Sequence, residues 1–174
     1  SSLDKKIFDK SEPIIYLSPK GKKFDQFYAK KIMNKNINII CGHFEGIDER
    51  ILETRNIEQV SIGDYVLTGG ELPSLVLMDS IIRLLPGAIG HGAEAVADDS
   101  HTSGLLQYPQ YTRPAEYKGD RVPEVLLSGD HSAIAQWRRK EALRRTLMRR
   151  PEMLSATDLS VTDKITLEAL RDEA

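Results

Sequence analysis

The stretch Ser-Ile-Gly-Asp-Tyr-Val-Leu-Thr-Gly-Gly-Glu-Leu-Pro, from Ser61 to Pro73, decides the fold of this chain. It carries three glycines, a proline and two carboxylates around an apolar centre, and a nearly all-apolar helix pattern follows it directly. Because glycine has no Cβ, it lets the backbone come close to a neighbouring group. The stretch is therefore typical of a segment that approaches a ligand.

Strand and helix patterns alternate upstream of this stretch. Short β-branched runs at 13–17 and 37–41 predict buried strands, and a third strand begins at 60–62. A helix pattern over 22–33 separates the first two strands, with Phe27 on its predicted inner face, and a shorter one covers 47–53. This alternation predicts an α/β domain with a mainly parallel sheet.

Three short loops follow these strands, at 17–19, 41–46 and 61–65. Ligands of open parallel sheets bind beyond the carboxyl ends of the strands, and glycine or proline in each loop favours backbone contacts to a small ligand. The alternative is that the loops are simply tight turns. The chain has no Gly-x-Gly-x-x-Gly after a strand and no phosphate-loop pattern, which argues against a dinucleotide fold.

A helix is predicted over 74–85, started by Pro73 and ended by Pro86-Gly87. Arg83 on this helix has two interpretations: a local ion pair with Asp79, or a cation aimed at an anionic or carbonyl group of a ligand. The glycine- and alanine-rich segment that follows predicts a flexible linker or lid. Its Asp98-Asp99 pair is either a solvated turn or a general base delivered by the lid.

The last third of the chain is strongly divided in charge. Residues 105–150 carry 10 basic and 5 acidic side chains, whereas residues 151–174 carry 2 and 6. A long helix predicted over 132–150 places Arg138, Arg145 and Arg149 on one face, with Arg139 flanking them. Such a face is either solvated or, as we favour, a contact for a polyanion. The predicted domains are 1–88 and 104–174, joined by the linker 89–103.

Composition excludes several classes of protein. The chain has 174 residues, 40% hydrophobic and 29% charged, as expected for a globular protein. No apolar run could span a bilayer, and the first residues lack a signal-peptide pattern, so a cytoplasmic location is expected. Cys41 is the single cysteine, so neither an internal disulfide nor a cysteine zinc site is expected.

Four blocks of the sequence resemble, in order, the bacterial tRNA (guanine-37-N1)-methyltransferases of the knotted SPOUT class, and the resemblance runs from about Ile14 to Leu154. The blocks are Tyr16-Leu17-Ser18-Pro19-x-Gly21, Cys41-Gly42-x-Phe44-Glu45-Gly46-Ile47-Asp48-Glu49-Arg50, the stretch Ser61 to Pro73, and Tyr111-Thr112-Arg113-Pro114. The family has about seventy further residues before the position of Ile14, roughly half a typical domain. Either the sequence given omits this part of the protein, or the chain is a truncated form whose sheet and dimer contacts are incomplete.

The resemblance implies an α/β fold with a mainly parallel sheet, a deep C-terminal trefoil knot in the catalytic domain, and a small helical C-terminal domain. It implies S-adenosylmethionine as the cofactor, bound in the knot. The matching cofactor positions are Leu17, Ser18, Gly42, Phe44, Ser61, Ile62, Gly63, Tyr65, Leu67, Gly69, Gly70 and Pro73. Glycines here would let the backbone reach the adenine and ribose edges, beside an apolar wall.

The implied reaction is methylation of N1 of guanine-37 in tRNA, next to the anticodon. The family's general base maps to Asp99, with Asp98 adjacent, and its active-site arginine maps to Arg83, which would stabilise negative charge on the guanine O6. Glu45 is a third contributor, through Mg²⁺ or the guanine edge. The resemblance also implies a homodimer with its site between subunits, and tRNA, rather than DNA or a membrane, as the partner of Arg138, Arg139, Arg145 and Arg149. The alternatives are another SPOUT RNA methyltransferase and a non-catalytic RNA-binding protein of the same fold.

Overall fold

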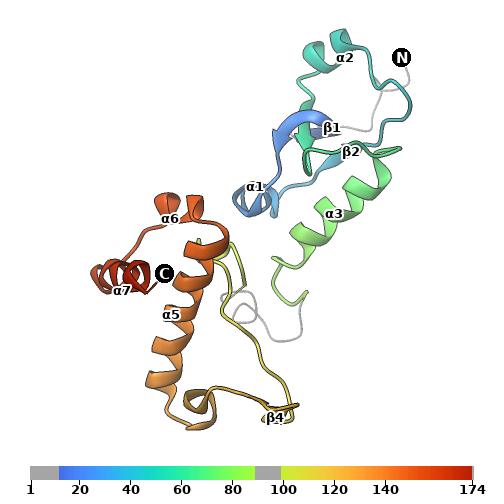
Figure 1. Ribbon diagram of the computed structural model, residues 1–174. Helices are drawn as coiled ribbons and strands as arrows, with labels where there is room; N and C mark the ends of the chain where they lie inside the picture. The colour runs from blue at the N-terminus through green and yellow to red at the C-terminus, as the bar shows by residue number, and fades with distance from the viewer. Residues whose placement is uncertain (1–11, 89–98, 174) are drawn as a thin grey trace. The chain divides into compact units, whose positions relative to one another are not determined.

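The computed structural model describes residues 12–88 and 99–173 (Figure 1). The chain divides between residues 93 and 94 into two units, which are described separately. The N-terminal unit contains β1 (Ile14–Lys23), α1 (Gln26–Ile32), β2 (Asn38–Ile40), α2 (Glu49–Thr54), β3 (Glu58–Ser61) and α3 (Glu71–Ile82). The C-terminal unit contains β4 (Glu116–Tyr117), β5 (Asp120–Arg121), the 3₁₀ helix η2 (Glu124–Leu127), α5 (His131–Arg149), α6 (Glu152–Ala156) and α7 (Val161–Asp172).

The sheet of the N-terminal unit has the order β2-β1-β3, and both pairings are parallel. Ile15 of β1 lies opposite Ile39 of β2, and Leu17 lies opposite Val60 of β3. Both α1 and α3 bury apolar side chains against this sheet. The core consists of Ile15, Leu17, Ala29, Ile32, Val60, Leu77 and Ile81. The prediction of an α/β unit with a parallel sheet is confirmed.

The first strand is longer than the sequence pattern predicts. It continues through Gly21 to Lys23 and pairs again with β3, where Lys22 lies opposite Val60. A Cβ on Gly21 would lie 2.4 Å from the backbone of Gln59, so only glycine allows the second contact. The helix expected from residue 22 therefore begins at Gln26, capped by the Asp25 side chain, and Phe27, predicted to face inward, is 78% exposed.

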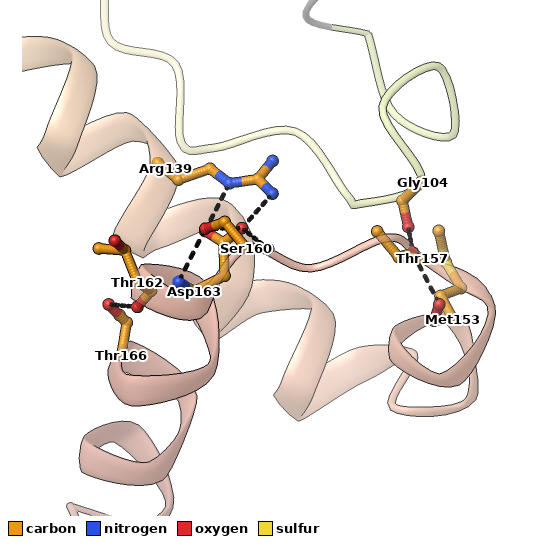
Figure 2. Close-up of polar contacts among 8 residues, drawn as sticks. All are labelled: Gly104, Arg139, Met153, Thr157, Ser160, Thr162, Asp163 and Thr166. Atoms are coloured by element: carbon orange, nitrogen blue, oxygen red, sulfur yellow. Dashed lines mark hydrogen bonds and ion pairs between the residues drawn. The ribbon is translucent and has the colours of Figure 1, made fainter.

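The C-terminal unit is built on the long helix α5, which packs with α7 around Leu105 and Leu143. Arg139 of α5 donates two hydrogen bonds to Asp163 of α7, from Nε at 2.9 Å and Nη2 at 2.8 Å (Figure 2). The Asp163 carboxylate also accepts from the backbone and side chain of Ser160, and the Ser160 hydroxyl accepts from the Asp163 N–H. This capping box starts α7, and the bonds from Arg139 to the same carboxylate tie α7 to α5.

Only part of the predicted linker belongs to the described residues, because positions 89–98, including Asp98, lie outside them. The segment that follows Asp99 is fastened to the C-terminal unit. Leu105 is buried, and the Thr157 hydroxyl donates to the carbonyl of Gly104 at 2.8 Å (Figure 2). The predicted boundaries of the linker and of the two domains stay predictions.

Candidate functional site

A hollow lies at the carboxyl ends of the parallel strands in the N-terminal unit. It is bordered by residues 16–20 of β1, by the loops after β2 and β3, and by the start of α3. The expected loop at 17–19 is therefore wrong, because these residues belong to β1, where its pairing with β3 shifts register after Leu17. All twelve residues expected to bind the cofactor line it, and so does Glu45. The structure thus brings together residues that the sequence separates by up to fifty-six positions, from Leu17 to Pro73.

The loop after β2 and the loop before α3 are joined by backbone contacts. His43 and Gly69 form an antiparallel bridge, and the Gly70 N–H donates to the Gly42 carbonyl at 3.1 Å. The Ser74 hydroxyl donates to the Gly70 carbonyl at 2.6 Å and lies 3.0 Å from the Cys41 sulfur. These bonds hold two walls of the hollow in one position.

Glycine is required where these loops meet. A Cβ on Gly70 would lie 2.6 Å from Cα of Cys41, a backbone atom that cannot move aside without shifting β2. The φ of Gly70 is −81°, which any residue adopts, so contact and not backbone conformation is the reason for glycine here. The close approach that we expected toward a ligand is, at this position, an approach between two segments of the protein.

The loop after β3 supplies a polar turn and an apolar edge to the hollow. The Ser61 hydroxyl donates to the Gly63 carbonyl at 3.0 Å and accepts from the Gly63 N–H at 3.2 Å. Tyr65 and Leu67 remain 54% and 40% exposed, and Phe44, from the loop opposite, is fully exposed. Apolar side chains left open around a hollow are typical of a site that a ligand or a second chain covers.

Sequence reasoning missed the hydrogen bond between His43, which lines this hollow, and Glu71 at the start of α3. His43 Nε2 lies 2.5 Å from the Glu71 Oε1, and this contact links the two joined loops a second time. A hydrogen bond from its own backbone N–H lowers the pKa of the Glu71 carboxyl, and His43 lowers it further. Both residues stand within the quoted motif blocks, but only the folded loops bring them together.

The three residues expected to carry the chemistry lie in different parts of the chain. Arg83 lies at the C-terminal end of α3, where its N–H donates to the Asp79 carbonyl, and Glu45 is exposed at the edge of the hollow. Asp99 belongs to the C-terminal unit, in a turn closed by a bond from the Thr102 N–H to the Asp99 carbonyl. Within residues 12–88 and 99–173, no group of three or more histidine, cysteine or carboxylate residues could hold a metal ion.

The basic helix α5 has two kinds of cation. Arg139, Lys140, Arg144 and Arg150 form ion pairs with carboxylates of Asp163, Glu141, Glu152 or Glu173. Arg138, Arg145 and Arg149 have no ion pair with any residue that the structure describes, and Arg138 lies over the Tyr108 ring at 4.8 Å. The acidic end of the chain therefore neutralises one side of the helix and leaves the predicted arginine face available. Of the described helices, none has the length and apolarity needed to cross a membrane.

Comparison with known proteins identifies the family. Residues 2–156 match the family model described as tRNA (Guanine-1)-methyltransferase TrmD. The chain is 52% identical over 163 residues to the tRNA (guanine-N(1)-)-methyltransferase of Dehalococcoides mccartyi strain CBDB1, covering 92% of this chain and 65% of that protein. It is also 52% identical over 152 residues to the protein of the same name from Geobacillus kaustophilus strain HTA426, covering 87% and 61%. The chain therefore spans slightly less than two thirds of the length of these relatives. It belongs to the tRNA (guanine-1)-methyltransferase family.

Proposed function

We propose that this chain binds S-adenosylmethionine in the hollow of its N-terminal unit and methylates N1 of guanine-37 in tRNA. The observation that carries the proposal is the convergence of residues 16–20 of β1 with the loops after β2 and β3 on one hollow, which is lined by every residue that matches a cofactor position of the family. The names of the relatives, tRNA (guanine-N(1)-)-methyltransferase, support the same reaction.

The residues around the hollow fit such a cofactor. Backbone groups of the glycine-containing loops supply donors and acceptors for a nucleoside, and Ile62, Tyr65 and Leu67 supply an apolar wall for its base. When bound, S-adenosylmethionine supplies a methyl group attached to a positively charged sulfur. A contribution of Mg²⁺ at Glu45 stays a prediction.

The nucleophile needs a base before it can react. Guanine N1 carries a proton, and we assign the removal of that proton to the Asp99 carboxylate. The residues that line the hollow would hold the cofactor, which would supply the methyl group to N1 once Asp99 holds the proton. We assign Arg83 to the negative charge that develops on O6 meanwhile.

The partner is a folded RNA. The exposed arginines of α5 would bind its phosphates, and the target base must leave its stack to reach a pocket. Arg138, Arg145 and Arg149 are the contacts we assign, whereas Arg139 already holds Asp163 in the same unit. A tRNA substrate also favours a cytoplasmic location.

We further propose a homodimer with the active site between subunits. An apolar stripe on α3 supports it, because Leu72, Leu75 and Ile82 are 60%, 57% and 53% exposed at the spacing of one helix face. The return of residues 69–70 onto the loop after β2 supports a trefoil knot, in which the chain after the second strand threads through a loop.

Calorimetric titration with S-adenosylmethionine tests the cofactor site. We expect Tyr65→Ala to weaken binding by about fivefold or more, since a partly exposed aromatic contact contributes roughly 1 kcal/mol. Tyr117→Ala, an equally exposed tyrosine on β4, is the matched control and should bind as the unaltered chain does. Asp99→Ala should bind the cofactor normally and lose nearly all methyl transfer. Absence of any binding heat for the unaltered chain contradicts the proposal.

A further inference from the structure

The C-terminal unit has a hollow of its own. It lies between the segment 108–115, η2 and the first half of α5, and its volume of about 420 Å³ exceeds the 190 Å³ of the hollow in the N-terminal unit. Its main lining residues are Tyr108, Tyr111, Arg113, Leu126, Ile134 and Arg138. Of these residues, only Arg138 has a role assigned above, as a contact to an RNA phosphate.

The walls of this hollow combine flat rings with positive charge. Tyr111 is 48% exposed, and its ring centre lies 6.3 Å from that of Trp137 behind it. Two other lining residues also contact each other: the Arg138 guanidinium lies 4.8 Å from the centre of the Tyr108 ring. Aromatic rings and guanidinium planes are the surfaces on which unpaired bases stack.

Charge distinguishes a nucleic-acid ligand from a peptide or a second protein. Two arginines line the hollow and no carboxylate does, so a bound group meets a positive potential. The same helix carries Arg145 and Arg149, neither of which has an ion pair among the described residues. A phosphate chain could therefore follow α5 while one of its bases enters the hollow.

We propose that this hollow binds one unpaired nucleotide of the RNA substrate, with its base against Tyr111 and its phosphate near Arg113 and Arg138. The inference rests on the proposed function only in taking RNA as the partner. It adds a second base-binding site, in the C-terminal unit, to the one that the reacting guanine requires. A base inside a duplex remains stacked on its neighbours and cannot enter, so the hollow selects single-stranded or looped RNA.

Binding of two RNA probes tests this site without any methyl transfer. Trp137 is the single tryptophan of the chain and contacts Tyr111, so its fluorescence reports on the hollow. We expect an eight-nucleotide single-stranded RNA to change this fluorescence, and the same RNA paired with its complement to change it much less. Tyr111→Ala should weaken single-strand binding roughly 5- to 150-fold, the range measured for the loss of one stacked base.

Matched variants separate stacking from general charge. Tyr111→Phe keeps the ring and should bind within about twofold of the unaltered chain, as should Tyr117→Ala on β4. Arg149→Ala should weaken single-strand and duplex binding alike, because it removes a phosphate contact. Leu127→Glu leaves the tyrosines in place and brings a carboxylate to the edge of the hollow, so it should weaken single-strand binding even if Tyr111→Ala does not fold.

The first two of three results that overturn the proposal concern Tyr111→Ala: a variant that is folded by circular dichroism and binds single strands normally, or losses that are equal for single strand and duplex. Leu127→Glu binding at the unaltered level overturns it as well. Because neither S-adenosylmethionine nor a reacting guanine is present, failure here leaves the proposed methyl transfer standing. Conversely, a chain that shows no methyl transfer can still bind single-stranded RNA in this hollow, so that failure leaves the present proposal standing.

Discussion

Gly70 decides how closely two loops of the N-terminal unit approach each other. We expect Gly70→Ala to lower the free energy of unfolding by roughly 1–3 kcal/mol, because its Cβ would meet the backbone of Cys41 at 2.6 Å. The control is Gly69→Ala, whose Cβ would meet only the side-chain ends of Glu71 and His43. Urea unfolding measures both variants, and equal losses would contradict the role given to Gly70.

The Asp163 carboxylate makes the stability of the C-terminal unit depend on pH. Its hydrogen bonds from Arg139 lower its pKa to about 2, against an unfolded value near ~3.9. A carboxylate whose pKa is lower in the folded chain than in the unfolded chain stabilises the fold at pH values above the unfolded pKa. This stabilisation is lost as the pH falls through the folded pKa. We expect a loss of up to about 2 kcal/mol between roughly pH 4.5 and pH 2, measured by denaturant unfolding.

Asp163→Asn should remove most of this pH dependence and lower stability at neutral pH, because Arg139 then lacks its ionic partner. Asp158→Asn changes an exposed carboxylate of the same unit and should keep the acid slope. If Asp163→Asn and the unaltered chain lose stability in parallel below pH 4.5, the pairing with Arg139 does not contribute as described.

At the scale of the elements, the sequence predicted which segments form helices and strands better than it predicted where these elements begin and end. Apolar periodicity predicted the three parallel strands and α5, because those segments bury one face or both. The pattern ended β1 too early, since the second pairing after Gly21 depends on the backbone of β3, which lies far away in the sequence. The helix pattern that began at residue 22 also predicted an inward-facing Phe27. This prediction was wrong, because α1 begins only at Gln26.

The apolar stripe of α3 makes a prediction about assembly. We expect sedimentation equilibrium to find a dimer, and Leu75→Asp to shift it toward monomer by at least about tenfold in dissociation constant, because a charge at a buried apolar contact is costly. Ile165→Asp on α7, where the side chain is 62% exposed, is the matched control and should leave the dimer unchanged. A monomeric unaltered chain, or equal effects of both variants, would refute the interface on α3.

For the molecule as a whole, parallel topology predicted that the loops after the strands meet at one edge of the sheet, and the loops after β2 and β3 do so. The individual cofactor positions followed from the family resemblance and not from the strand pattern. The partner of Arg139 and the hollow beside Tyr111 could not be predicted in this way. Both depend on packing between segments of the C-terminal unit that are far apart in sequence, as Arg139 and Asp163 are.

Methyl transfer to tRNA is the most direct test of the central claim. The unaltered chain is mixed with labelled S-adenosylmethionine and two tRNAs that differ only in guanine or adenine at position 37, and the methylated base is located by the stop it causes in primer extension. We predict incorporation into the guanine-37 tRNA alone, with the stop at that base. Equal labelling of both tRNAs, a stop elsewhere, or no transfer by a chain that binds the cofactor would contradict the account.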